Sequence, residues 1–251
     1  MIGIVFTGLY SNYLLIVNMV MQVVNIIFNS VSASVGDYNA RKSKAEAFEL
    51  FKAMNTISYW IFGMSSICLF TLFQPTINIW LGEDYMLDAP CVMMIALNFL
   101  LAGIIRVPST FVDVNGLYTK TKFKPITMAM LNLVMSIVCA NIWGLVGIFL
   151  GTFGSYILVG LWVDPYFLYK YKFSKSFMKY ILSLLLNLTI IVIIGFLTYS
   201  IVSLVKNYML KVLICFAVTN ILFAAAYCKT EGFRFVYQRI RNVVKIKNKF
   251  N

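Results

Sequence analysis

The segment CVMMIALNFLLAGIIRVPSTFVDVNGLYTKTKFK (Cys91–Lys124) contains an apolar run long enough to cross a lipid bilayer, which takes about 20 residues as a helix. This run carries Arg106 near its middle and Asp113 toward its end. A charge inside a span costs about 2.5–3.5 kcal/mol on insertion scales, so an ionisable residue there is a functional-site candidate by default. The segment therefore predicts a membrane-spanning helix that carries a functional charge.

The polar side chains of this segment fall on one side of the predicted helix. Steps of three and four residues bring the following residues onto that face: Asn98, Ala102, Arg106, Ser109, Thr110 and Asp113. Arg106 either has a structural role, by pairing with Asp113 or a neighbouring helix or by snorkelling to an interface, or it faces a water-filled cavity that receives an anionic ligand. Both interpretations remain open at this point.

The composition of the whole chain indicates a membrane protein. Hydrophobic residues make up 61% of the 251 residues and charged residues 12%, and the mean hydropathy is +0.85. A soluble globular chain has about 25% charged residues. The predicted fold class is therefore an all-α transmembrane bundle, because helices satisfy their own backbone hydrogen bonds in hydrocarbon.

Several function classes are excluded by residues or motifs that the sequence lacks. It contains no histidine, which removes His-based general bases, Ser/His/Asp triads and the usual zinc sites. Neither GxxxxGK[ST] nor GxGxxG occurs, so no ATP or dinucleotide site of the usual kinds is expected. The five cysteines are scattered through apolar stretches, which is typical of small buried hydrophobes. An enzyme, a cofactor and a bound metal are therefore not expected.

The connections between the apolar stretches predict a topology. Seven spans are expected, at residues 13–35, 55–81, 90–112, 125–143, 145–164, 180–204 and 209–228. Basic connections, which include Arg41, Lys122 and Lys172, alternate with acidic or neutral ones such as Glu83–Asp88. The positive-inside rule then places the N-terminus outside and the C-terminus in the cytoplasm.

The net charge of +12 has the same explanation, because the basic residues form short clusters between apolar spans. Nucleic acid is therefore not an expected partner. The basic tail from Lys229 onward is expected to attract anionic lipid headgroups.

The first span carries a second polar seam. Its residues are spaced by four, three, four and three positions, which places them all on one helical face: Asn18, Gln22, Asn25, Asn29 and Ser32. Amides in hydrocarbon need partners, so the seam either bonds across helices or lines a wet cavity together with Arg106. The candidate substrate-binding residues are therefore Arg106, Asp113, Asn98, Asn18, Gln22 and Asn25.

Three further local patterns have structural interpretations. The apolar residues Ala45, Phe48, Phe51 and Met54, among Arg and Lys, predict a short amphipathic helix on the cytoplasmic surface, with a solvated basic loop as the alternative. Small residues in the fifth span, Gly144, Gly147, Gly151 and Ser155, predict close helix packing. Asp164 precedes Pro165 near the cytoplasmic boundary, where helix-end geometry is favoured over ion coupling.

An ordered set of short stretches resembles the polysaccharide-transporter branch of the multidrug/oligosaccharidyl-lipid/polysaccharide flippase superfamily, the O-antigen and capsule repeat-unit flippases. The stretches are GLYSNY (8–13), SASVGD (32–37), IWLGEDY (79–85), NGL (115–117), KPITMAMLNLVMS (124–136), WGLVGIFLGT (143–152) and DPYFLYK (164–170). The resemblance runs from about Gly8 to Lys175, and the last two spans match only as generic hydrophobic helices.

This resemblance implies two pseudo-symmetric six-helix lobes around a cavity that opens alternately to each side of the membrane. Residues 1–175 are expected to form the core of the C-terminal lobe, with five spans, and residues 176–251 to add two terminal spans and the basic tail. The N-terminal lobe and the helix after it are expected to be missing, because GLYSNY is similar to the start of the second helix of the C-terminal lobe. In such families cationic cavity residues meet the lipid pyrophosphate and acidic sugars, and here Arg106 suits that role.

The expected function is a flippase in the bacterial inner membrane that moves polyprenyl-pyrophosphate-linked oligosaccharide repeat units to the outer leaflet for surface polysaccharide synthesis. One alternative is a multidrug or organic-cation antiporter of the same superfamily, which would use carboxylates such as Asp113 and Asp164. Another is an integral-membrane polysaccharide polymerase, although the longest outer loop has only about ten residues, too few for its usual catalytic domain. A third is a transport-dead remnant of a disrupted gene.

Overall fold

A computed structural model of the chain describes residues 4–41, 43–228, 230 and 232–234. Within these residues the regular structure is entirely helical, and seven helical stretches are long and apolar enough to span a membrane. These stretches are Phe6–Ile26, Lys44–Trp80, Ala89–Val114, Tyr118–Trp143, Leu145–Phe173, Phe177–Ser203 and Tyr208–Tyr227. The prediction of an all-α polytopic bundle of seven spans is confirmed.

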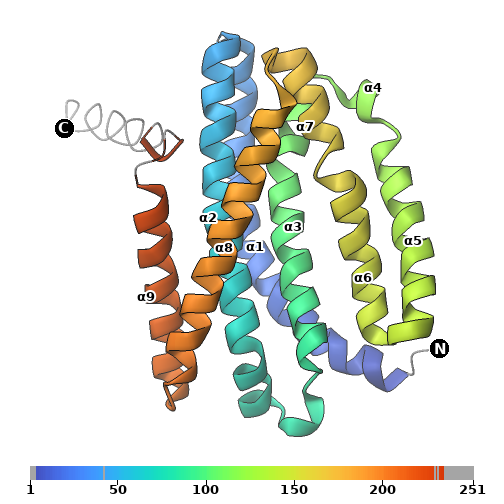
Figure 1. Cartoon of the computed structure of the whole chain (residues 1–251), viewed down its shortest axis with the longest axis vertical. Coiled ribbons are helices and arrows are strands. Elements are labelled where there is room, and N and C mark those ends of the chain that lie inside the picture. The colour runs from blue at the N-terminus through green and yellow to red at the C-terminus, as the bar shows by residue number, and fades with distance from the viewer. Residues whose placement is uncertain (1–3, 42, 229, 231, 235–251) are drawn as a thin grey trace.

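Between Ile4 and Tyr227 the described residues form twelve helical elements. Figure 1 shows how the α-helices are arranged. The long helices are α1 (Ile4–Arg41), α2 (Lys44–Trp80), α3 (Ala89–Val114), α5 (Lys124–Trp143), α6 (Leu145–Ser155), α8 (Phe177–Ser203) and α9 (Tyr208–Tyr227). The short elements are η1 (Glu83–Tyr85), α4 (Tyr118–Thr121), the π-helical η2 (Tyr156–Gly160), α7 (Val163–Phe167) and the π-helical η3 (Leu168–Phe173).

Helix α2 begins earlier than the sequence analysis predicts. Ser43 caps it, accepting a hydrogen bond from the Glu46 amide, and the Glu46 carboxylate accepts one from the Ser43 amide. This reciprocal capping box starts a helix that continues without a break to Trp80. The separate amphipathic surface helix is therefore a wrong prediction, because Phe51 and Met54 are buried in the first turns of α2 itself.

The centre of the bundle is the contact between α2 and α3. A Cβ atom at Gly103 would lie 1.9 Å from Phe62 Cγ, so only glycine lets the two helices approach this closely. The Ser58 hydroxyl donates to the Gly103 carbonyl at 2.9 Å, and the Ser66 hydroxyl donates to the Ala96 carbonyl at 2.7 Å. These bonds hold α3 rigidly against α2 and orient the side chains of its remaining faces.

Helices α5 and α6 form a hairpin packed through glycines. Gly144, with φ of 59°, makes the turn, and Cβ atoms at Gly147 and Gly151 would lie 2.2 Å from the Cys139 backbone and 2.0 Å from Ser136 Oγ. The predicted small-residue ridge is therefore confirmed for these two positions. Gly144 instead supplies a backbone conformation that L-residues rarely adopt.

The last two spans pack on the other side of α2. The indole of Trp60 donates to Asn220 Oδ1 in α9 at 3.3 Å, and the Tyr227 hydroxyl of α9 donates to Asn187 Oδ1 in α8 at 2.6 Å. A Cβ at Gly63 would lie 2.7 Å from the Phe223 ring and 3.1 Å from Ile191. Helix α2 is therefore shared between the terminal spans and the helices that surround α3.

The two ends of the bundle differ in charge. Helix α4, the start of α2 and segment η3 lie at one end in Figure 1, with Lys44, Lys120, Lys122 and Lys172. Segment η1, with Glu83 and Asp84, lies at the opposite end, together with the α5–α6 turn. We call these the basic end and the acidic end of the bundle.

Candidate functional site: an arginine held by neutral partners

Among the described residues, all hydrogen bonds of the Arg106 side chain go to helix α1. Nη1 donates to Asn25 Oδ1, and Nη2 donates to Asn29 Oδ1 at 3.0 Å. The guanidinium carbon lies 5.2 Å from the centroid of the Phe28 ring, within cation–π range. Asn25, Phe28 and Asn29 share one face of α1, because they are three and four residues apart. The site therefore forms where the polar seam of α1 meets the polar face of α3.

Only part of the predicted seam takes part. Asn25 and Asn29 bond across helices to Arg106, as one of the two interpretations of the seam required. Asn18 and Gln22 are exposed, and neither side chain has a hydrogen bond to any residue that the structure describes. The side chain of Ser32 lies outside the described residues. No described hydrogen bond therefore connects Asn18 or Gln22 to Arg106, although both were predicted to belong to the same site.

Asp113 is not the partner of Arg106. Its side chain is exposed, and no ion pair or hydrogen bond joins it to Arg106 across the residues with described positions. The charged groups that lie within electrostatic range of its carboxylate are Asp164 and Lys124. Both residues were predicted on one face of the helix. Asp113 is the last residue but one of α3, which ends at Val114, whereas the guanidinium of Arg106 turns toward α1. The proposed pairing of the two residues is therefore wrong for this conformation.

The guanidinium borders a small, partly open pocket with a cavity volume of about 40 Å³. Its lining combines polar atoms of Arg106, Asn29 and Thr110 with the apolar side chains of Phe28 and Met54. The Thr110 hydroxyl is occupied by its own helix, donating to the Arg106 carbonyl at 3.0 Å. Arg106 lies in the part of α3 nearer the basic end, eight residues before Val114, and not at the middle of the helix.

Asn98 lies on another side of α3. Its Nδ2 donates to the Phe149 carbonyl of α6 at 3.0 Å, and its buried Oδ1 has no partner among the described atoms. The predicted polar face of α3 is wide enough to contact two neighbours, because at 100° per residue its members spread over about a third of the helix surface. One edge meets α6 and α7, and the other meets α1. Asn98 therefore belongs with the first edge and not with the Arg106 pocket.

A second charged group lies on the α6–α7 side and was missed by the sequence analysis. Lys124, the first residue of α5, forms an ion pair with Asp164 of α7, and the two side chains are only 10% and 3% exposed. The Ser109 hydroxyl lies 2.5 Å from Asp164 Oδ2 and accepts from Lys124 Nζ at 3.1 Å. Asp164 is therefore more than a helix-end residue. The signal in the sequence was a carboxylate inside the fifth apolar stretch and a lysine at the edge of the fourth.

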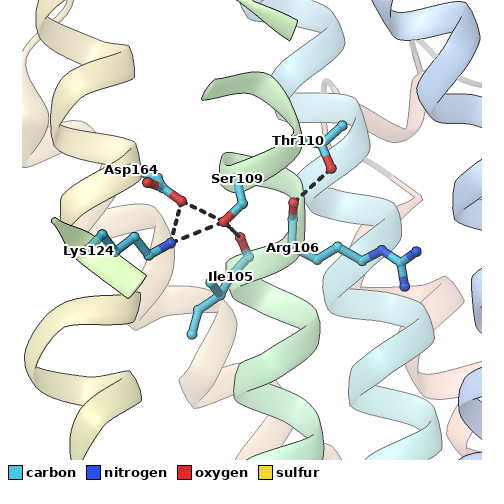
Figure 2. A network of polar contacts seen from close by, with 6 residues as sticks. All are labelled: Ile105, Arg106, Ser109, Thr110, Lys124 and Asp164. Atoms are coloured by element: carbon cyan, nitrogen blue, oxygen red, sulfur yellow. Dashed lines mark hydrogen bonds and ion pairs between the residues drawn. The ribbon is translucent and has the colours of Figure 1, made fainter. Parts of the chain in front are cut away.

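Figure 2 shows how the two charged groups are arranged around α3. Ser109, Lys124 and Asp164 converge on one side of the helix, and the Arg106 side chain extends to the other side, away from them. The lysine has a carboxylate partner, whereas the arginine has only neutral ones among the residues described. Chemically, the first arrangement is a closed pair, and the second is a cation that can still bind an anion.

Within the described part of the chain, no cluster of three or more His, Cys, Asp or Glu side chains could hold a metal ion. Comparison with models of protein families, with curated proteins and with solved structures finds no match to this chain.

Proposed function

We propose that this protein acts in a flippase of the polysaccharide-transporter branch, which carries polyprenyl-pyrophosphate-linked oligosaccharide repeat units from the cytoplasmic to the outer leaflet of a bacterial inner membrane. In this proposal Arg106 receives the pyrophosphate or an acidic sugar of the substrate. A second lobe, of the kind the family resemblance implies, completes the cavity. The observation that carries the proposal is a guanidinium inside an apolar span whose described partners are neutral amides and an aromatic ring.

The described partners of Arg106 are neutral and leave its charge uncompensated. The amides of Asn25 and Asn29 satisfy donors of the guanidinium but contribute no negative charge. An anion that enters the pocket therefore meets a positive charge that no described carboxylate offsets. Arginine suits a phosphate because its planar fork binds two oxygens at once and because it stays protonated at physiological pH.

The direction of transport is consistent with the membrane potential. With a negative cell interior, moving two negative charges outward gains about 4–5 kcal/mol at 100 mV. This energy suffices without nucleotide hydrolysis, which agrees with the lack of a P-loop motif in the sequence.

The cation-antiporter alternative is less well supported by the geometry. Such a protein requires membrane carboxylates that are free to bind a cation. Asp164 is already neutralised by Lys124, and Asp113 is exposed at the end of α3. The chain therefore offers an anion site more readily than a cation site.

We also propose that the basic end faces the cytoplasm. The support is the separation of Lys120 and Lys122 at one end from Glu83 and Asp84 at the other (Figure 1). Single cysteines, Asp84→Cys and Lys122→Cys, in a chain without its native cysteines test the orientation. An impermeant thiol reagent added to intact cells should label Asp84→Cys, and labelling of Lys122→Cys alone would reverse the assignment.

The role of Arg106 is tested by measuring surface polysaccharide in cells that carry variants in place of the native gene, normalised to the amount of protein in the membrane. Arg106→Ala should lower export at least about tenfold, the effect of losing one charge-assisted hydrogen bond, without lowering abundance. Arg106→Lys should retain part of the activity because it keeps the charge.

Thr110→Val is the matched control, because Thr110 lines the same pocket but bonds to its own helix. A combined Arg106→Ala and Asp113→Ala change separates the substrate role from charge neutralisation. Recovery of export in this double variant would show that Arg106 only balances Asp113, and unchanged export in Arg106→Ala would refute the substrate role directly.

A further inference from the structure

A second groove lies toward the acidic end of the bundle, between α2, α3 and α8, with the start of α9 at its side. It is partly open to the surroundings and has a cavity volume of about 270 Å³. Its apolar wall includes Phe70, Val92 and Val202, and its polar lining includes Thr71 and Lys211. This groove is separate from the Arg106 pocket, which lies toward the basic end.

Two polar groups in the groove have unmet bonding capacity. Thr71 is buried, and its hydroxyl makes no hydrogen bond of normal geometry to a described atom. The Cys215 thiol donates to Cys68 Sγ at 3.6 Å and not to Thr71. Lys211 has no carboxylate within ion-pair distance in the part of the chain described here. Gln74, which also lines the groove, is fully occupied, because it accepts from the Tyr13 hydroxyl at 3.0 Å and donates to the Leu87 carbonyl.

The two unmet groups lie at similar depths. Helix α9 runs beside α2, because the Tyr208 hydroxyl contacts the Thr76 hydroxyl at 3.0 Å and the Cys215 thiol donates to Cys68 Sγ at 3.6 Å. Lys211 lies between Tyr208 and Cys215 in α9, and Thr71 lies between Cys68 and Thr76 in α2, so the two residues are at about the same level of the groove. A ligand that meets both groups therefore carries an anionic group and a hydrogen-bond acceptor close together, with an apolar part against Phe70, Val92 and Val202. A glycerophospholipid combines a phosphate, a nearby ester carbonyl and an acyl chain in this way.

We propose that the groove binds one anionic glycerophospholipid. The phosphate pairs with Lys211, an acyl ester carbonyl accepts a hydrogen bond from Thr71, and an acyl chain lies along the apolar wall. This site does not depend on the proposed transport function.

The charges around the mouth favour a lipid whose headgroup lacks an amine. Lys206 lies in the connection between α8 and α9, next to Lys211, so an ammonium headgroup would add a third positive charge. Asp88 adjoins Ala89 at the rim of the groove, but it lines a separate pocket with Phe6 and Trp143. A phosphatidylglycerol headgroup meets these conditions.

Native mass spectrometry of the full purified chain, titrated with phosphatidylglycerol or phosphatidylcholine, tests the site. Phosphatidylglycerol should bind more tightly than phosphatidylcholine, and its tightest single binding event should depend on Lys211 and Thr71. Lys211→Gln should weaken phosphatidylglycerol binding about tenfold, because a charge-assisted bond is lost. Thr71→Val should weaken it about threefold, the typical effect of one hydrogen bond between polar groups in a membrane.

Two matched variants control for general effects. Thr198→Val changes a buried threonine that also has no described hydrogen-bond partner but does not line the groove, and Lys179→Gln removes an exposed lysine at the start of α8, at the far end of that helix from the groove. Both should bind phosphatidylglycerol like the unmodified chain. Thr71→Val should not lower stability, because no protein hydrogen bond is lost.

Three results would overturn the proposal. The first is equal binding of the two lipids, and the second is a loss of affinity in the control variants as large as in Lys211→Gln. The third is displacement of the lipid by an equal concentration of inorganic phosphate, which would show that the groove recognises the free anion and not the lipid.

Discussion

Arg106 and the Lys124–Asp164 pair are two charged groups on opposite sides of α3, and they differ in how their charge is balanced. Lys124 is compensated by a carboxylate and shares Ser109 with it, and both charged side chains are almost fully buried. Arg106 is held by Asn25 and Asn29, which accept from two of its five N–H donors and leave its charge in place. Burial of a cation in this bundle does not by itself indicate function, because the nature of the partner decides whether the charge remains available.

The two arrangements also differ in their energetic demands. Once formed, a buried ion pair is costly to break, because removing one partner leaves an uncompensated charge in a medium of low dielectric constant. A guanidinium is more weakly hydrated than an ammonium group and can stack on an aromatic face, as Arg106 does on Phe28. It therefore tolerates a partly buried position without a counter-ion. We expect the pair to matter mainly for stability and the arginine mainly for binding.

The largest expected effect is that of Asp164→Asn, which removes the carboxylate from the closed pair. We expect the free energy of unfolding to fall by about 3–5 kcal/mol, because Lys124 is left buried without a counter-charge. Titration of the purified protein with sodium dodecyl sulfate in mixed micelles, followed by circular dichroism, measures the change.

The double variant Lys124→Met with Asp164→Asn is the control for this prediction. It removes both charges, so most of the lost stability should return. If the single and double variants were equally unstable, the cause would be altered packing and not an unpaired charge.

Ser109→Ala tests the third member of the closed group. The hydroxyl contacts both Asp164 and Lys124, so we expect the free energy of unfolding to fall by about 1–2 kcal/mol in the same titration. Export should be unaffected at equal abundance, since Ser109 does not line the Arg106 pocket. A selective loss of export would mean that the closed group also takes part in transport.

Asn25→Asp should convert the open site into a closed one. The new carboxylate would pair with Arg106 and raise the free energy of unfolding by at most about 1 kcal/mol, the usual contribution of a partly exposed ion pair. If anion binding by Arg106 is required, surface polysaccharide should fall to the level of Arg106→Ala.

Asn25→Ala is the companion variant, because it removes the same amide without adding a charge. It should keep more export than Asn25→Asp. Equal export in the two variants would show that the charge of the pocket is unimportant.

The smallest effect is expected for Thr110→Val. This hydroxyl bonds only to the Arg106 carbonyl in its own helix, among the contacts that the structure records. We expect the free energy of unfolding to change by less than about 0.5 kcal/mol, as is usual for substitutions of surface residues. A larger loss would indicate that Thr110 holds the arginine backbone in place and that the two sides of α3 are less independent than the comparison implies.

The spans were predictable from sequence because each depends on the composition of one continuous stretch. The run from Ala89 to Val114, for example, is apolar over more than the length needed to cross a bilayer. The start of α2 was harder to place, because the basic residues around Lys44 obscured a helix whose first turns are amphipathic. The Ser43–Glu46 capping box, a recognisable local pattern, would have corrected it.

The candidate site was predicted in part. Arg106 and the seam with Asn25 followed from helical periodicity, since each set of residues lies on one helix. Asn98, Asn18 and Gln22 share those faces but contact other groups or none among the residues described. Periodicity places a side chain on a face and does not show which neighbouring helix that face meets.

The sequence by itself determined that this chain is a helical membrane protein with seven apolar spans, strongly basic connections that alternate with acidic, neutral or weakly basic ones, and a cation inside its third span. Only the tertiary structure decided which cation is neutralised. Asn25 is 81 residues from Arg106, and Asp164 is 40 residues from Lys124, so neither contact leaves a periodic trace in the chain. The physical reason is that insertion into a bilayer depends on local hydropathy, whereas charge compensation depends on which helix faces meet after the spans have packed.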